Sequence, residues 1–257
     1  MNKKYHFITG LPRSGSTLLS SILDQNPRFS SYISDNLSEC VCNILDSLND
    51  IGNITSKETK KSILKGIFEN YYSETEADLI FNTSREWTFL TPLISDLFPE
   101  SKYIVCVRDI NWILDSFERA QRKNPYNKTS YGGSITNSVY ARIDNLMSEN
   151  GIIMNPYNGI RQAIVSNEKY KLFFIEYDNL AKKPEETIKL LYSFLEEEYF
   201  EHDFNNVGKR FDEYDSYVGT DLHTVRKKVE FIKRDFILPP DILREFSNME
   251  FWREYFD

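Results

Sequence analysis

The sequence predicts an α/β fold, with a parallel central β-sheet flanked by helices. Short apolar segments typical of strands alternate along the chain with longer segments typical of helices. Residues 103–107, Tyr-Ile-Val-Cys-Val, form a continuous apolar run, which indicates a strand buried on both faces. A glycine-containing loop at residues 10–15 lies between the first expected strand and the first expected helix, where P-loop proteins bind phosphate.

The first part of the chain is predicted to contain two strands and four helices. Residues 4–9 are β-branched and aromatic and stop at Gly10, which favours a strand. Pro92 either kinks the fourth helix or opens it after Thr91. The expected elements are a strand at 4–9, helices at 16–25, 36–50 and 57–72, a strand at 78–81, and a helix ending at 98.

The second part continues the alternation and ends in helices. Ile110, Ile113, Leu114 and Phe117 recur at helical spacing, so residues 109–121 are expected to bury one face of a helix. The expected elements are a strand at 102–107, a helix at 109–121, a surface loop at 123–133, a strand at 171–175, a helix at 184–195, and a helical pair at 240–246 and 249–255.

Length and composition indicate one soluble globular domain covering residues 1–257. Lysine and arginine number 31 and aspartate and glutamate 39, which gives a net charge of −8. That charge argues against general binding to nucleic acid or to an anionic membrane. The three cysteines are too few for a disulfide framework, and we find no apolar segment long enough to cross a membrane. We therefore expect a cytoplasmic protein with reduced thiols.

The first motif is the segment Gly-Leu-Pro-Arg-Ser-Gly-Ser-Thr at residues 10–17. Its G-x-x-x-x-G-x-T spacing favours a loop that presents backbone N–H groups to a phosphate. Ser16 stands where ATP- and GTP-binding loops carry a lysine, and the positive charge is on Arg13 inside the loop. The loop therefore suits a nucleotide that has no γ-phosphate and needs no metal ion to neutralise one. We accordingly predict no metal site. The expected binding residues are Pro12, Arg13, Ser14, Gly15, Ser16 and Thr17.

The second motif is Arg108 followed by Ser116. Arg108 comes directly after the strand at 102–107, at the end of the strand where ligands bind in open α/β sheets. Ser116 lies about two turns along the next helix, so a bulky group such as a phosphate is needed to bridge the two side chains.

These motifs resemble the sulfotransferases that use 3′-phosphoadenosine 5′-phosphosulfate (PAPS). The loop at 10–17 is similar to the family's 5′-phosphosulfate loop, and Arg108 with Ser116 to its 3′-phosphate pair. Residues 98–109 resemble a segment of protein-tyrosine sulfotransferases. The similarity is best over 5–27, 80–123 and 171–230, and looks closest to bacterial-type members. The resemblance implies the P-loop-like sulfotransferase fold and PAPS as the sulfuryl donor.

The resemblance also implies further contacts with the nucleotide. Residues 176–180 resemble an element of the family that would place Tyr177 near the adenosine. Residues 222–230 resemble the late basic stretch that closes over the nucleotide, which makes Arg226, Lys227 and Lys228 candidate ligands.

The implied reaction moves a sulfuryl group to a hydroxyl or amine acceptor and needs a proton acceptor. Arg13 is the leading catalytic candidate. Glu86 stands where cytosolic members of the family have a histidine base, with Arg85 beside it in the part of an active-site lysine. Asp35 is a second candidate, because tyrosine sulfotransferases take a glutamate from this region. The assignment of the base stays open.

Two alternative functions also stay open: a P-loop kinase for a small metabolite, and a non-catalytic module that binds 3′-phosphoadenosine nucleotides. Residues 30–75, 124–160 and 200–222 are expected to cover the acceptor. They are rich in tyrosine, phenylalanine, asparagine and serine, a composition that permits a sugar, lipid head group, phenol, polyketide-type hydroxyl or peptide tyrosine.

Overall fold

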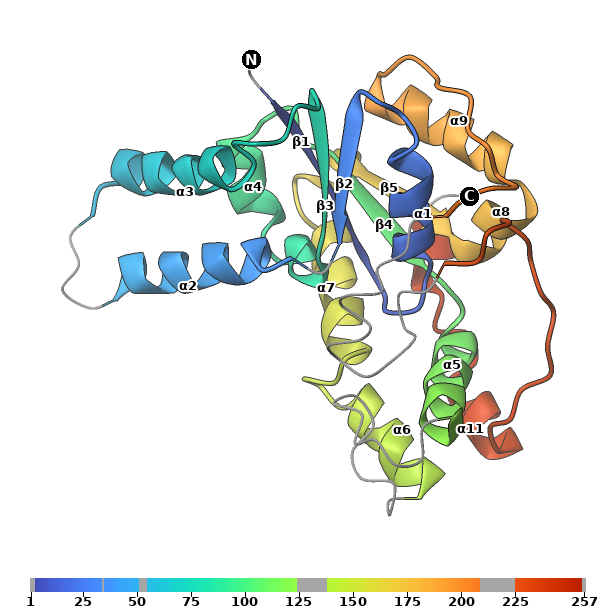
Figure 1. The fold of residues 1–257 in the computed structure, drawn as a ribbon. Coiled ribbons are helices and arrows are strands. Elements are labelled where there is room, and N and C mark those ends of the chain that lie inside the picture. The colour runs from blue at the N-terminus through green and yellow to red at the C-terminus, as the bar shows by residue number, and fades with distance from the viewer. Residues whose placement is uncertain (1–2, 34, 51–54, 124–137, 209–224, 256–257) are drawn as a thin grey trace.

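A computed structural model describes residues 3–33, 35–50, 55–123, 138–208 and 225–255 of the chain. At its centre is a five-stranded sheet with the order β2-β3-β1-β4-β5, in which every neighbouring pair is parallel (Figure 1). The strands are β1 (Lys4–Gly10), β2 (Phe29–Ile33), β3 (Leu79–Thr83), β4 (Tyr103–Val107) and β5 (Leu172–Glu176). The α/β prediction is therefore confirmed.

Helices cover both faces of this sheet, as a parallel sheet with buried strands requires (Figure 1). They are α1 (Ser16–Leu23), α2 (Leu37–Asn49), α3 (Lys57–Tyr71), α4 (Thr91–Leu97), α5 (Ile110–Lys123), α6 (Val139–Met147), α7 (Met154–Ile164), α8 (Tyr177–Lys182), α9 (Pro184–Leu195) and α11 (Pro240–Glu245). Three short 3₁₀ helices complete the described elements: η1 (Arg85–Thr88), η2 (Lys169–Lys171) and η3 (Phe251–Tyr255).

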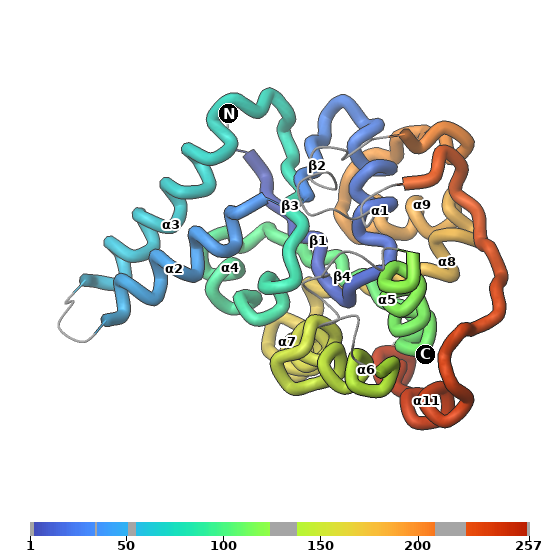
Figure 2. The backbone as a smooth tube through the Cα atoms, turned by 60° about the horizontal axis from the view of Figure 1, so that its bottom comes forward, coloured from blue at the N-terminus to red at the C-terminus, as the bar shows by residue number. Residues whose placement is uncertain are grey.

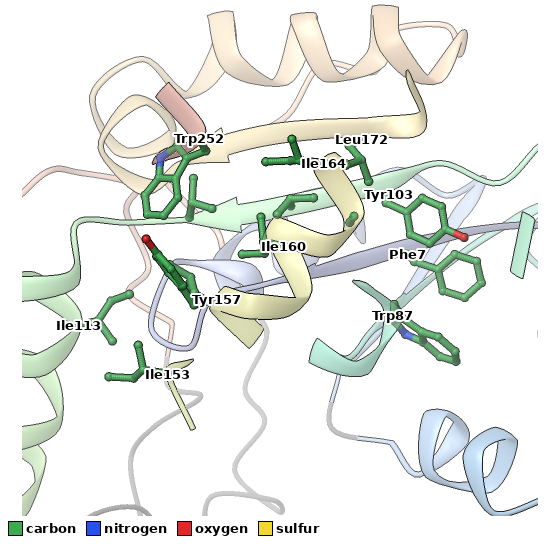
Figure 3. Packing of buried hydrophobic residues seen from close by; sticks show 14 of the residues in the cluster. Phe7, Trp87, Tyr103, Ile113, Ile153, Tyr157, Ile160, Ile164, Leu172 and Trp252 are labelled. Carbon is green, nitrogen blue, oxygen red and sulfur yellow. The ribbon is translucent and has the colours of Figure 1, made fainter. Parts of the chain in front are cut away.

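The two faces of the sheet carry two separate apolar cores. On one face, Phe7 and Tyr103 from neighbouring strands stack with ring centroids 5.6 Å apart, and Trp87 and Tyr157 pack into the same cluster (Figure 3). On the other face, Ile8 and neighbouring strand residues pack against α1 and α9. Phe7 is fully buried, and removing such a ring costs about 3–5 kcal/mol of stability.

Helices α2 and α3 lie side by side and project away from the sheet in both views (Figures 1 and 2). Ser56 caps α3 by accepting a hydrogen bond from the Thr59 backbone N–H. Among the described residues, no helix combines the length and apolar character that a bilayer span requires.

Most expected elements are present, with ends shifted by a few residues, but among the described strands and α-helices β2, α6, α7 and α8 escaped prediction. The segment 124–160 was expected to cover the acceptor. Within it, Tyr157 and Ile160 of α7 are buried in the core and so support the sheet; that other parts of the segment cover the acceptor stays a prediction. Residues 249–255 form a 3₁₀ turn at η3 in place of the expected helix. The expected surface loop lies almost entirely outside the described residues.

Candidate active site

A cleft of about 660 Å³ opens at the carboxyl ends of the strands. Because all five strands are parallel, each one delivers residues to this same edge of the sheet. The cleft is lined by the loop after β1, Asp35 after β2, Glu86 after β3, Arg108 after β4 and Tyr177 after β5. The structure therefore brings both anion-binding motifs and both candidate bases into one site.

The loop after β1 depends on two glycines. Gly10 has φ +120°, and a Cβ atom there would lie 2.0 Å from the backbone oxygen of Cys106. Gly15 has φ +94°, and its Cβ would lie 2.7 Å from the ring of Tyr177. Arg13 between them also has a positive φ, 59°. These left-handed residues fold the backbone into a tight turn directly before α1, the geometry in which successive N–H groups can face an anion.

Ser14 has a different part from the other loop residues. Its side chain is buried, and its hydroxyl donates to the backbone oxygens of Leu11 and Cys106, the latter at 2.9 Å. Pro12, Ser16 and Thr17 line the cleft, as expected for contacts with a ligand. The Ser14 hydroxyl thus fastens the loop to β4, and only its backbone is left to contact a bound group.

Arg13, Arg108 and Ser116 are in direct contact. The Nε of Arg13 donates to the Ser116 hydroxyl at 3.1 Å, and Arg108 donates to the Arg13 carbonyl at 3.4 Å. The Arg108 guanidinium lies 3.8 Å from the Tyr177 ring centroid and 4.6 Å from that of Trp112. These cation–π contacts hold a half-buried cation in place without neutralising it.

The charge on Arg108 is available for an anionic ligand. Its Nε is buried without a hydrogen-bond partner, and no ion pair of Arg108 exists among the described residues. Burial lowers the pKa of Arg108 to about 10, and the charges of Arg234 and Arg13 act in the same direction. The side chain is still protonated at neutral pH, so a phosphate group would relieve this electrostatic crowding.

The basic stretch lies on an extended segment, residues 225–238, that leads to α11 (Figure 2). Arg226 and Lys228 line the cleft. Lys227 is exposed and does not line the cleft in the described part of the chain; its carbonyl accepts a hydrogen bond from the Val207 N–H at 2.6 Å. Of the three expected basic ligands, two therefore line the cleft.

Glu86 and Arg85 lie on η1 and both line the cleft. One carboxylate oxygen of Glu86, Oε2, accepts hydrogen bonds from the hydroxyls of Ser84 and Ser38, the latter at 3.3 Å. Its other oxygen has no hydrogen-bond partner among the described residues. Arg85 is exposed and lines the cleft, while its carbonyl accepts from the Thr9 hydroxyl at 3.3 Å.

Asp35 is held more tightly than Glu86. Its Oδ2 accepts from the Asn82 amide at 2.6 Å and from the Tyr72 hydroxyl at 3.3 Å, and its Oδ1 accepts from the Leu37 N–H at 3.2 Å. Burial raises the pKa of the Asp35 carboxyl, and the three hydrogen bonds oppose that rise. Trp87 completes the network by donating to Asn82 at 2.7 Å. Both oxygens of Asp35 therefore serve the local structure.

Positive charge is concentrated in this cleft although the chain as a whole carries −8. Its cationic side chains are Arg13, Arg85, Arg108, Arg226, Lys228 and Arg234, and its carboxylates are Asp35, Glu39, Glu86 and Glu230. Residues of the described ranges offer no grouping of three His, Cys, Asp or Glu side chains suited to a metal ion. The donors present are those that bind phosphate and sulfate groups.

A comparison with protein families assigns the chain. Residues 6–201 match the model described as the sulfotransferase family, which is most of the sequence. The chain belongs to the sulfotransferase family. The resemblance drawn from the two motifs is therefore confirmed, and the parallel sheet with its flanking helices is the sulfotransferase fold.

Individual relatives are distant. A curated protein of Caenorhabditis briggsae, named "Putative protein-tyrosine sulfotransferase", is 26% identical over 199 residues; the match covers 75% of this chain but only 65% of that relative. The sulfotransferase domain from the curacin biosynthetic pathway has a TM-score of 0.59 at 16% identity, covering 95% of this chain and 96% of the other. Mouse sulfotransferase SULT7A1, solved with PAP, has a TM-score of 0.54 at 13% identity, covering 97% and 84%.

Among the cationic side chains that line the cleft, Arg234 is one that sequence reasoning missed. It comes after the recognised basic stretch, in a segment without helical or strand periodicity. The one available signal was its place between Phe231 and Phe236, which pattern alone does not distinguish from a solvated charge.

Proposed function

We propose that this member of the sulfotransferase family transfers a sulfuryl group from PAPS to a hydroxyl or amine acceptor. The observation that carries the proposal is the cationic cleft in which the β1 loop and Arg108 meet. Two anion-binding elements from neighbouring strands suit a nucleotide with phosphates at two separate positions. The charge of Arg108, which no ion pair within the described residues neutralises, and the left-handed turn of the loop fit such a ligand.

Each part of the donor has candidate ligands in the cleft. The loop residues and Arg13 would bind the 5′-phosphosulfate, and Arg108 with Ser116 the 3′-phosphate. Tyr177 would lie beside the adenosine. Arg226 and Lys228 would add positive charge from the extended segment.

The sequence of the loop favours this donor over ATP. Ser16 replaces the lysine that neutralises the β- and γ-phosphates in kinases. A transferred sulfuryl group carries less negative charge than a γ-phosphoryl group. Fixed cations and backbone N–H groups can therefore stabilise the charge that develops on the departing phosphate. We accordingly expect binding and transfer to proceed without a divalent metal.

Glu86 is the general base in this proposal. An acceptor hydroxyl needs a carboxylate oxygen that is free to take its proton, and Glu86 offers one at the exposed side of the cleft. Asp35 has both oxygens bound by local donors, so we assign it to positioning α2 and the cleft wall.

The division of labour among the side chains follows. When bound, PAPS supplies the sulfuryl group. Glu86 takes the proton of the acceptor as the new bond from acceptor oxygen to sulfur forms and the bond from sulfur to the 5′-phosphate oxygen breaks. Arg13 and the loop N–H groups hold the phosphate that departs, and Arg85 lies beside Glu86 to stabilise negative charge on the transferred group.

The test is a thermal-shift titration with adenosine 3′,5′-bisphosphate in EDTA, beside one with ATP and magnesium. A ligand that binds only the folded state stabilises it by about 2.7 kcal/mol at a hundredfold excess over its Kd. A shift with the bisphosphate alone supports the donor class. A shift only with magnesium-ATP would favour a kinase.

Transfer itself is tested with PAPS labelled at sulfur. Because the curated relative is named as a tyrosine sulfotransferase, tyrosine peptides are the first acceptors to include, followed by sugars and phenols. Binding of the bisphosphate without transfer to any acceptor would favour a non-catalytic nucleotide-binding module. Location in the cytoplasm remains a prediction of the sequence.

A further inference from the structure

Arg234 approaches the nucleotide end of the cleft from the extended segment. Its guanidinium carbon lies 4.8 Å from the ring centroid of Trp112, and that of Arg108 lies 4.6 Å from the same centroid. Arg234 lines the cleft together with Trp112 and Ser116. Two arginines from distant parts of the chain thus share one aromatic ring at the carboxyl end of β4.

A buried carboxylate fixes this arginine. Asp115 on α5 is fully buried, and its Oδ2 lies 2.9 Å from a terminal nitrogen of Arg234 and 2.7 Å from Nε of Arg119. Its Oδ1 accepts a hydrogen bond from the Ile237 N–H at 2.7 Å. Asp115 therefore ties the extended segment to α5, the helix that carries Ser116.

The arginines at this end of the cleft outnumber the carboxylates that pair with them. Arg119 and Arg234 share the one carboxylate of Asp115, and Arg108 has no ion-pair partner in the described part of the chain. Burial lowers the pKa of Arg234, and the charges of Arg119 and Arg226 push it the same way while Asp115 opposes. Cations gathered this closely are stabilised when an anion binds among them.

We propose that Arg234 is a further ligand of the nucleotide's 3′-phosphate, beside Arg108, and that Asp115 is its positioning residue. The inference rests on the proposed function, because the 3′-phosphate is assigned to Arg108 and Ser116 there. Trp112 and Ser116 are four residues apart on α5 and so project from the same face of the helix. Arg234 lies on this face, where it would make the site selective for a nucleotide phosphorylated at the 3′ position.

The experiment compares two ligands that differ only in that phosphate. Calorimetry measures the Kd of adenosine 3′,5′-bisphosphate and of adenosine 5′-monophosphate for the full chain. Arg234→Met is expected to raise the Kd of the bisphosphate at least tenfold and to change the Kd of the monophosphate less than twofold. Arg119→Met is the matched control, since Arg119 pairs with the same Asp115 oxygen but does not line the cleft in the described structure. It is expected to keep the wild-type ratio of the two Kd values.

Each outcome is informative. An Arg234→Met chain that keeps the wild-type ratio, or that loses affinity for both ligands equally, overturns the assignment to the 3′-phosphate. The ratio of the two Kd values within one variant does not depend on the folded fraction of that variant. Arg234→Lys retains the charge, so its ratio is expected to fall between those of wild type and Arg234→Met. If the wild-type chain itself does not prefer the bisphosphate, the proposed function fails and Arg234 is not the cause.

Discussion

Gly15 permits a sharp prediction because the structure separates two costs of replacing it. Its backbone is left-handed, at φ 94° and ψ 13°, and its Cα faces the ring of Tyr177. In Gly15→Ala, the new Cβ would lie 2.7 Å from Cδ2 of Tyr177, closer than carbon atoms approach in proteins. The ring must then move away from the loop, which disturbs its stacking with Arg108.

The expected cost has a backbone part and a packing part. An L-residue in the left-handed conformation costs about 1–2 kcal/mol. Forcing a methyl group into a packed site typically adds about 1–3 kcal/mol. We therefore expect Gly15→Ala to lower the free energy of unfolding by about 2–5 kcal/mol. In a Tyr177→Ala background the ring is gone, and only the backbone part of about 1–2 kcal/mol should remain.

Chemical denaturation of the four chains, wild type, both single variants and the double variant, measures this directly. The coupling energy between the two substitutions should be favourable and equal to the packing part. Equal losses for Gly15→Ala with and without the tyrosine would refute the reasoning, since the ring would then not be in contact with the loop. The denaturation is run without nucleotide, so a role of Tyr177 in binding does not enter.

Three further outcomes follow from the geometry. Glu86→Gln should retain affinity for adenosine 3′,5′-bisphosphate and lose about 10²–10⁴ in kcat, measured with labelled PAPS; a nearly normal kcat would move the base elsewhere. Gly10→Ala should fail to reach the native fold, judged by circular dichroism, because its Cβ would overlap the Cys106 carbonyl. Burial lowers the pKa of His6 from 6.5 to about 3, so the unfolded chain binds the extra proton and stability should fall as the pH drops below 6.5. The variant His6→Asn, which can still accept from the Lys102 N–H, should flatten denaturation midpoints measured between pH 6.5 and 5.

Elements with strong local patterns were predictable, and those shaped by distant contacts were not. The helix at α5 was clear from its spacing of apolar residues. Strand β2 was not, because its sequence Phe-Ser-Ser-Tyr-Ile lacks an apolar run; Ser31 is nonetheless buried, where its hydroxyl shares a 2.6 Å hydrogen bond with that of Ser20. A pair of serines that satisfy each other is invisible to a hydropathy pattern.

Helix α7 shows the same limit. Pro156 and Gly159 resemble helix breakers in the sequence, yet the proline lies in the first turn, where its missing N–H costs nothing. A Cβ at Gly159 would lie 2.5 Å from the Thr88 hydroxyl, so the glycine lets α7 pack closely on η1. Only the folded chain reveals that reason.

Site residues that directly follow a strand were predictable, and those contributed by a segment distant in sequence were not. The β1 loop and Arg108 stand directly at strand ends, so their proximity follows from a parallel sheet. Arg234 reaches the cleft through an ion pair with Asp115, a residue far away in sequence. The sequence likewise left the choice between Glu86 and Asp35 open, because the Asn82 and Tyr72 side chains that bind Asp35 come from other elements.

The order of the strands fixes how far apart the functional residues lie along the cleft. From β3 through β1 and β4 to β5, the strand ends carry Glu86, the loop, Arg108 and Tyr177. Neighbouring strands lie about 4.8 Å apart, so these four stations span roughly 14 Å in even steps. The two anion-binding positions, the loop and Arg108, are one such step apart, so a ligand that fits them carries its anionic groups on a short, stiff spacer, such as a ribose phosphorylated on two different carbons. The strand spacing of the parallel sheet would then select the donor by the distance between its phosphate groups, in addition to the charge that individual side chains recognise.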